Sequence, residues 1–436
     1  MKVALVEVIS QRKECINKDF MGGYGWAFKV GNSFRARAIE AVKRTGERLP
    51  IMSLGYLAAI FSSGGHTVEY TNGVVADADL ALIYSSMVDY RADLEMAARY
   101  KRETRAKVGF IGPFASHRPD QFVAAADLVV VGEPEHYAMQ VVASGEVGEG
   151  IVQSPDIKEM DTLPFPDWSS FPVSSYSYFP ALRQRPFLPV LSSRGCPYTC
   201  EYCPYEIIKW RPRSVENVLD ELQQIREQYR VRAFLFRDPI FTVHRERTVR
   251  LMEGMLSRGF TFRWACETRM DCLDVELIEL MHRAGMRVLN VAVESSSDAV
   301  LKGVHRKPIP VKHQEEILGA CDRLGIRATV FYVLGLPEDT AESIAETVRY
   351  AKHLNTHVAQ FFVFTPFPGT HLYDKVKADI MTDDWQQFDC YTPVVKNPTL
   401  ASAEILRLKE WAFVSYYYRP AWLGKFLVRV ARDLVD

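Results

Sequence analysis

Residues 188–364 alternate short apolar strands with amphipathic helices, and this alternation constrains the fold more than any other feature of the sequence. Parallel strands require crossover connections, so six strands with five helices between them predict a partial (β/α) barrel. In barrels of this type, the chemistry lies at the carboxyl ends of the strands. The expected strands are 188–193, 233–237, 263–267, 288–293, 328–334 and 358–364.

The first 150 residues carry a second β/α alternation, which predicts a doubly wound, Rossmann-like parallel sheet. Ligands of such sheets bind beyond the carboxyl ends of the strands. A proline-rich stretch then separates the two patterns. The predicted α/β chain therefore has a Rossmann-like domain at 1–155, a linker at 156–187, the partial barrel at 188–375 and a helical C-terminal region at 376–436. The strands expected in the first domain are 1–8, 66–70, 79–85, 107–112 and 127–132.

The charge balance argues against a polyanionic partner. The 53 Lys and Arg residues face 54 Asp and Glu, giving a net charge of −1, whereas binding to nucleic acid needs a concentrated basic surplus. No apolar run reaches the roughly 18 residues that span a bilayer, and no signal-peptide pattern begins the chain. We therefore expect a cytoplasmic protein with no transmembrane segment and no nucleic-acid partner.

Three of the eight cysteines, Cys196, Cys200 and Cys203, crowd into one loop directly after the first barrel strand. Three thiols at this spacing can reach three corners of an iron–sulfur cube and leave the fourth iron without a protein ligand. Structural zinc and unrelated buried cysteines are the alternatives. A zinc site usually has a fourth Cys or His at short spacing, and the residues immediately after Cys203 offer none. A disulfide framework would spread its cysteines more widely.

With Tyr202 just before the third cysteine, this CxxxCxxC run resembles the signature of the radical S-adenosylmethionine (SAM) superfamily. The resemblance implies that Cys196, Cys200 and Cys203 hold a [4Fe–4S] cluster, that SAM chelates the open iron, and that Tyr202 lies along the adenine of SAM. One electron, from a donor such as flavodoxin or ferredoxin, would then cleave SAM to methionine and a 5′-deoxyadenosyl radical.

Other strand ends carry polar candidates for the site. Glu267 and Arg269 should share one face of the third strand, and with Asp238 they are the candidates for binding substrate or the SAM tail and for acid–base work. The resemblance implies that Glu294 and Ser295 contact SAM. From the residues alone, a capping or ion-pair role is the alternative for a carboxylate that leaves a buried strand.

Residues 52–135 resemble the cobalamin-binding domain of one radical SAM subgroup, in the stretches 54–59, 65–68, 108–113 and 131–135. Two departures count against bound cobalamin. Gly112-Pro113 stands where the subgroup has paired glycines, and the proline removes an N–H and adds bulk. Between Tyr70 and Asp79 there is no room for the usual helix. Likeness of fold does not establish the ligand, so cobalamin as a cofactor stays open.

The whole pattern, including residues 21–25, is similar to that of the radical SAM diol dehydratases of apramycin biosynthesis, which carry the cobalamin-like domain and work without cobalamin. The resemblance implies a lyase that abstracts hydrogen from a hydroxylated small molecule. It would dehydrate a 1,2-diol of an aminoglycoside or aminosugar in antibiotic biosynthesis, with a pathway reductase acting on the product.

Two further functions stay open. The first is a cobalamin-dependent methyltransferase acting on an unactivated carbon, and hopanoid-type enzymes belong to the same subgroup. The second, from a different class, is a non-catalytic iron–sulfur or corrinoid carrier. A carrier would not need polar residues at the ends of six barrel strands.

Overall fold

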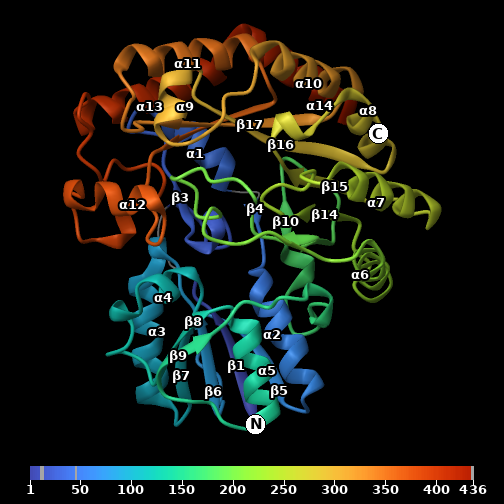
Figure 1. The fold of residues 1–436 in the computed structure, drawn as a ribbon, viewed down its shortest axis with the longest axis vertical. Helices are drawn as coiled ribbons and strands as arrows, with labels where there is room; N and C mark the ends of the chain where they lie inside the picture. The colour runs from blue at the N-terminus through green and yellow to red at the C-terminus, as the bar shows by residue number, and fades with distance from the viewer. Residues whose placement is uncertain (10–13, 45–46, 434–436) are drawn as a thin grey trace.

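The computed structural model describes residues 1–9, 14–44 and 47–433, and it divides into two lobes (Figure 1). Each lobe is built around a six-stranded sheet in which all neighbouring strands are parallel. Within the described residues, no helix combines the length and the apolar character that crossing a membrane would require. The expected α/β architecture is confirmed.

The first sheet forms the lower lobe in Figure 1 and has the strand order β5-β1-β6-β7-β8-β9. The side chains of β6 are all buried because helices cover the sheet. The five expected strands are present, together with an edge strand, β9, that was not predicted. The strands of the first sheet are β1 (Lys2–Glu7), β5 (Thr67–Asn72), β6 (Leu80–Tyr84), β7 (Lys107–Ile111), β8 (Leu128–Gly132) and β9 (Gly150–Ser154).

Helices connect most strands of the first sheet, and they include α2 (Met52–Ser63), α3 (Tyr90–Glu103), α4 (Pro113–His117) and α5 (Pro134–Ser144). As the sequence predicted, β5 runs to β6 without an intervening helix. Gly55 in α2 permits a close approach, because a Cβ there would lie 2.7 Å from the ring of Trp168. Trp168 is buried, so the proline-rich stretch packs firmly onto the first lobe.

The second sheet is an open arc whose six strands follow one another in sequence order, which confirms the partial barrel. β11 ends earlier than expected, because the residues that follow it turn away from the sheet and make their hydrogen bonds outside it. The strands are β11 (Phe187–Val190), β14 (Ala233–Phe236), β15 (Arg263–Glu267), β16 (Met286–Glu294), β17 (Arg327–Leu334) and β18 (Val358–Val363).

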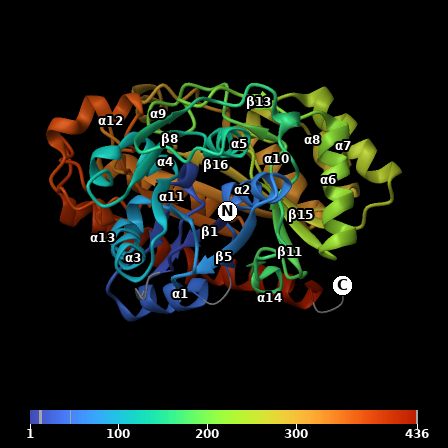
Figure 2. The ribbon, with the colours of Figure 1, turned by 90° about the horizontal axis from the view of Figure 1, so that it is seen from below.

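The five expected barrel helices are present on the outside of the arc, and they are α6 (Val215–Gln228), α7 (Arg245–Ser257), α8 (Val275–Arg283), α10 (Val311–Leu324) and α11 (Ala341–Leu354). Four of them begin at a side chain that accepts a hydrogen bond from the first turn. The capping residues are Ser214, His244, Asp274 and Thr340. Seen from below, α6, α7 and α8 lie on one side of the molecule and α12 (His371–Val376) on the other (Figure 2).

Segments from both ends of the chain complete the barrel. α13 (Ser402–Tyr417) packs on β18, and α14 (Pro420–Asp433) follows it; α1 (Phe34–Arg44) contacts α13. The C-terminal region was expected to be helical from residue 376, but residues 377–400 are mainly irregular and the long helices begin at Ser402. Residues 21–23 form a 3₁₀ turn between the short strands β2 (Cys15–Asn17) and β3 (Trp26–Phe28).

Candidate functional site

The barrel encloses a cavity of about 630 Å³. One end is lined by the three clustered cysteines and by polar residues at the ends of β15 and β16, and the walls are lined by inward side chains of β16, β17 and β18. Residues of α1, α13 and α14 line the remainder, and many of these are aromatic or aliphatic. The cysteine loop and the carboxyl ends of the strands therefore open into one enclosed space.

The cysteine loop is closed at its base by a short antiparallel pair, β12 (Ser193–Arg194) and β13 (Arg211–Pro212). Gly195 adopts a φ of 81°, and a Cβ there would lie 2.3 Å from the carbonyl oxygen of Lys209, so this turn requires glycine. The N–H of Cys196 donates to the carbonyl of Ile208 at 3.0 Å. The backbone thus fixes the loop so that its three thiols face the cavity.

The environment of the thiols suits a cationic group. Burial, with a smaller contribution from the Cys200 thiol, raises the pKa of Cys196 to about 11, and burial also raises the pKa of Cys203. Thiolates are the metal-binding form, so bound irons would supply the positive charge that ionisation of these thiols needs. Among the described residues, no three His, Cys, Asp or Glu side chains surround a single ion position. In a cubane cluster each cysteine binds a different iron, so a cluster does not require the three thiols to surround one ion position.

A polar trio lies beside the cysteines. The Tyr202 hydroxyl donates to Glu294 Oε1 at 2.8 Å, and Arg306 Nη1 lies 3.6 Å from the same oxygen. Arg306 also donates to the carbonyl of Ala292 at 3.1 Å and lies 4.0 Å from Cys200 Sγ. All three side chains line the cavity. Arg306 was not predicted, because it lies outside every strand end and carries no motif.

Local backbone geometry explains how Glu294 reaches the cavity. The register between β16 and β17 shifts between Ala292 and Glu294, and Glu294 has a φ of 66°. A left-handed conformation is strained for a non-glycine residue, and such strain is typical of functional sites. Ser295, expected to contact SAM, is not among the cavity-lining residues; its hydroxyl lies 3.3 Å from that of Thr347 on α11.

Glu267 and Arg269 both line the cavity, and so does Thr268 between them. Glu267 and Arg269 thus lie on the cavity side as expected, and Thr268 joins them beyond the end of β15 at Glu267. Arg269 forms two 2.9 Å hydrogen bonds to Asp271 and lies 4.2 Å from the ring centroid of Tyr198. Its Nη1 is buried and has no hydrogen-bond partner among the described residues, so this donor is available for a ligand.

Asp238, expected to bind substrate, is fully buried outside the cavity lining. Its carboxylate accepts hydrogen bonds from the Ser192 N–H at 2.9 Å, the Ser192 hydroxyl at 2.7 Å and the Ser193 hydroxyl at 2.5 Å. These bonds turn the chain just after β11. Asp238 therefore fixes the start of the cysteine loop, and the structure does not bring it to the substrate space.

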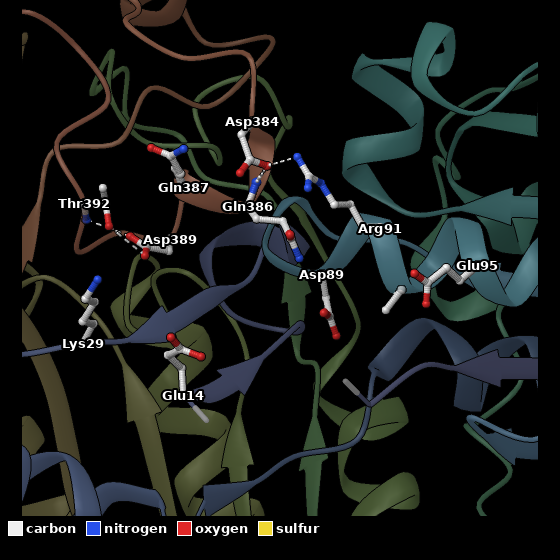
Figure 3. Close-up of a pocket in the computed structure, with 11 residues that line it drawn as sticks. Glu14, Lys29, Asp89, Arg91, Glu95, Asp384, Gln386, Gln387, Asp389 and Thr392 are labelled. Atoms are coloured by element: carbon white, nitrogen blue, oxygen red, sulfur yellow. Dashed lines mark hydrogen bonds and ion pairs between the residues drawn. The ribbon is translucent and has the colours of Figure 1, made fainter. Parts of the chain in front are cut away.

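A second pocket, of about 590 Å³, lies on the surface where α3 meets residues 384–392 (Figure 3). Its polar side chains bond one another: Arg91 pairs with Asp384 at 3.1 Å, and Asp389 accepts from the Thr392 hydroxyl at 2.9 Å. None of the three clustered cysteines lines this pocket. The barrel cavity is therefore the better candidate for the reaction site.

The carboxyl edge of the first sheet is the place where a doubly wound fold binds its ligand. Here residues 21–25 pack against this edge. The Tyr84 hydroxyl donates to the carbonyl of Gly23 at 3.2 Å, and a Cβ on Gly23 would lie 2.2 Å from that hydroxyl and 2.8 Å from Pro113. Tyr24 is buried and donates to the carbonyl of Pro368 at 2.6 Å, so this segment also contacts the second lobe.

This packing tests whether cobalamin fits. Ligands of doubly wound sheets lie beyond the strand ends, and Gly23, Tyr84 and Pro113 pack together in that place here. This packing disfavours a corrin at the edge of the first sheet.

Residues 190–351 match the radical SAM superfamily. The chain is 26% identical to an uncharacterized methyltransferase of Pyrococcus horikoshii, over 88% of this chain and 92% of that protein. It is 24% identical to the anaerobic magnesium-protoporphyrin IX monomethyl ester cyclase of Rubrivivax gelatinosus, over 85% of this chain and 74% of that protein.

Solved structures extend the likeness to both lobes. TsrM from Kitasatospora setae, a radical SAM methyltransferase solved with cobalamin and a [4Fe–4S] cluster, aligns with a TM-score of 0.66 and 14% identity, over 96% of this chain and 89% of that chain. The cobalamin-dependent SAM radical enzyme OxsB aligns with a TM-score of 0.60 and 17% identity, over 86% of this chain and 55% of that chain.

The radical SAM match spans residues 190–351 and includes the CxxxCxxC run, as the sequence indicated, and a radical SAM domain implies a [4Fe–4S] cluster and SAM as cofactors. The chain has the two-lobed fold of TsrM and OxsB.

Proposed function

We propose that this chain uses its cluster and SAM to remove a hydrogen atom from a hydroxylated small molecule held in the barrel cavity. The observation that carries the proposal is that the three cysteines, the Tyr202–Glu294–Arg306 trio and the enclosed cavity share one space. When bound, cluster and SAM supply a carbon-centred radical after one-electron reduction by an external donor such as flavodoxin or ferredoxin.

The chain's own residues bind and orient the reactants. Cys196, Cys200 and Cys203 hold the cluster. Tyr202 presents its ring to the adenine of SAM, and the carboxylate of Glu294, held by Tyr202 and Arg306, accepts hydrogen bonds from SAM. The largely apolar walls keep water from the reacting groups.

For the outcome of the reaction, we propose loss of water from a 1,2-diol. The substrate gives up one hydrogen atom from a hydroxyl-bearing carbon, and the neighbouring hydroxyl leaves as water with a proton. The hydroxyl on the carbon that lost its hydrogen atom then releases its own proton, which replaces the one taken up by the water, and this hydroxyl becomes a carbonyl. One further electron and one proton from the donor system complete a ketone, so each turnover consumes one SAM and two electrons.

Two observations support dehydration. The packed carboxyl edge of the first sheet favours direct hydrogen abstraction, without a corrin. Burial raises the pKa of Glu267, although the Arg237 guanidinium opposes this shift, and a carboxyl with a raised pKa can pass the proton between the two hydroxyls.

The second candidate function is cobalamin-dependent methyl transfer to an unactivated carbon. The names of the relatives favour it over dehydration: they include the P. horikoshii methyltransferase and, among the structures, TsrM with bound cobalamin. The R. gelatinosus protein is named as a cyclase and not as a methyltransferase, although its sequence is also similar to this chain. Proteins similar to this chain are therefore named for more than one reaction.

Corrinoid binding separates the two candidates. After anaerobic reconstitution with iron, sulfide and excess hydroxocobalamin, followed by desalting, we expect a visible spectrum of the cluster with no retained corrinoid. Stoichiometric corrinoid would overturn dehydration in favour of methyl transfer. As a second measurement, a methyltransferase that takes its methyl group from SAM releases S-adenosylhomocysteine, and we expect 5′-deoxyadenosine without it.

Glu294→Gln should weaken SAM binding to the cluster-loaded protein. Hydrogen bonds to a charged group contribute about 1.5–3 kcal/mol, so we expect a loss of roughly 10- to 100-fold in affinity. Tyr202→Phe, which removes the hydroxyl that holds Glu294 but keeps the ring, should cost less. Equilibrium dialysis with labelled SAM measures both variants. An unchanged dissociation constant for Glu294→Gln would remove Glu294 from the SAM site.

A further inference from the structure

The barrel cavity reaches the molecular surface at α1, at residues 179–180 and at α14. Some residues of its lining are also exposed to solvent, and they mark where the cavity opens. The exposed residues of the lining are all apolar or aromatic, and they are Val42, Phe179, Pro180, Tyr418, Leu423 and Phe426. The mouth of the cavity is therefore an apolar surface.

The apolar surface continues beyond the mouth on both helices. Phe34 at the start of α1 is 86% exposed, and Leu427 of α14 is 65% exposed. The Tyr418 hydroxyl donates to the carbonyl of Arg35 at 3.3 Å, so the start of α1 lies beside the turn into α14, and both helices lie along the lower edge in Figure 2. Exposed apolar patches of this kind mark surfaces that bind a protein or a membrane. The mouth patch consists of Phe34, Val42, Phe179, Tyr418, Leu423, Phe426 and Leu427.

α14 is anchored to the barrel, but one of its faces is left uncovered. The Trp422 indole N–H donates to the carbonyl of His357 at 3.1 Å, and the Lys425 ammonium donates to the carbonyl of Asn355 at 2.8 Å. Leu423 and Leu427 are one helical turn apart and share the exposed face. With 14 residues, α14 is too short to span a bilayer, so it can only lie along a surface.

The two helices that carry the mouth patch are basic, although the whole chain is balanced. In sequence, α1 and α14 contain seven Lys or Arg and two Asp or Glu, against 53 and 54 in the whole chain. Arg35 and Arg37 of α1 are exposed. The carboxylates on and around these helices already accept hydrogen bonds from backbone N–H groups or pair with lysines, and they are Glu40, Glu47, Asp322 and Glu410. The mouth patch therefore combines apolar side chains with positive charge.

We infer that the mouth patch docks on the surface of an anionic lipid bilayer, so that the barrel cavity opens towards the membrane. The apolar side chains enter the boundary between headgroups and acyl chains, and the basic residues face the anionic headgroups. A second copy of this chain, docked through the same patch, would bring like charges together. The inference goes beyond the proposed function and does not depend on which reaction the cavity supports.

Flotation with lipid vesicles tests the docking. The full chain, reconstituted with its cluster, is mixed anaerobically with vesicles of phosphatidylcholine alone or of phosphatidylcholine with phosphatidylglycerol. We expect about tenfold stronger partition into the vesicles that contain phosphatidylglycerol, and high salt should remove this difference because it screens the charges. Failure to float with either vesicle, or equal partition into both at low salt, would overturn the inference.

Surface variants locate the contact. Leu427→Glu should lower partition into the anionic vesicles about tenfold, because it removes a large apolar side chain from the patch and adds a negative charge. Arg37→Glu, which changes charge alone, should also lower it about tenfold. The control Val74→Glu makes the same kind of change at a 63% exposed side chain in the first lobe and should leave partition unchanged.

The oligomeric state of the same samples distinguishes the other occupant. A dimer that Leu427→Glu dissociates and that vesicles do not displace would assign the mouth patch to a second copy of the chain and overturn the inference. Equal partition of the wild type, Leu427→Glu and Arg37→Glu would place the lipid contact elsewhere and overturn it as well. Leu427 does not line the cavity, so 5′-deoxyadenosine formation by Leu427→Glu in solution should equal that of the wild type.

Discussion

Replacing Cys200 by Ala is expected to abolish both the iron–sulfur absorbance of the reconstituted protein and its formation of 5′-deoxyadenosine. Cys200 is the most buried of the three loop thiols, and Arg306 Nη1 lies 4.0 Å from its Sγ. With two ligands left, a cubane cluster has two irons without protein ligands, and the single open iron needed to chelate SAM is no longer defined. The expected change is complete loss.

Cys321→Ala is the matched control for this experiment. Cys321 is also fully buried, but it lies on α10 and does not line the cavity. The same sulfur deletion there should leave iron content and SAM cleavage intact. Retention of either the cluster absorbance or 5′-deoxyadenosine in Cys200→Ala would contradict the assignment of the loop. Circular dichroism of both variants shows whether the fold is retained.

The barrel was predictable because its signals are local. Buried parallel strands appear as short apolar runs, helices as amphipathic stretches, and most of the helices have a capping side chain that marks where they begin. β9 was not predicted because most of its side chains are partly or fully exposed, so Gly150–Ser154 lacks the apolar run of a central strand. The irregular stretch 377–400 was not predicted because its hydrophobic pattern does not distinguish it from the helix that follows.

The site was only half predictable, because several of its positions depend on backbone irregularities. The spacing of the cysteines is a sequence property, so Cys196, Cys200 and Cys203 could be found at once. The turn of Glu294 into the cavity depends on a register shift with β17, and Asp238 is withdrawn by the serines after β11. Arg306 has no motif, and its place in the site depends on contacts between distant segments.

Arg194 directly precedes Gly195 and Cys196 at the base of the cysteine loop. Its guanidinium lies 3.0 Å from Glu133 and 3.0 Å from Glu135, both in the first lobe, and Glu135 is fully buried. The first lobe thus holds the base of the cysteine loop through these ion pairs. Arg194→Gln leaves Glu135 buried without its cation, so we expect the free energy of unfolding of the cluster-free protein to fall by about 3–5 kcal/mol.

The acid sensitivity of the same contact gives a second readout of Arg194→Gln. Burial alone would raise the pKa of Glu133, but the guanidinium groups of Arg194 and Arg211 lower it from 4.5 to about 2. A carboxyl whose pKa is lower in the folded state stabilises the fold above pH 4.5, and this stabilisation is lost as the pH falls towards 2. The free energy of unfolding of Arg194→Gln should therefore fall less steeply than that of the wild type over this pH range.

The control Lys107→Gln breaks an exposed pair with Glu149 and should cost less than about 1 kcal/mol. Urea titrations from pH 2 to 7 measure both variants, and equal effects of the two substitutions would show that the contact between the lobes does not support the cysteine loop.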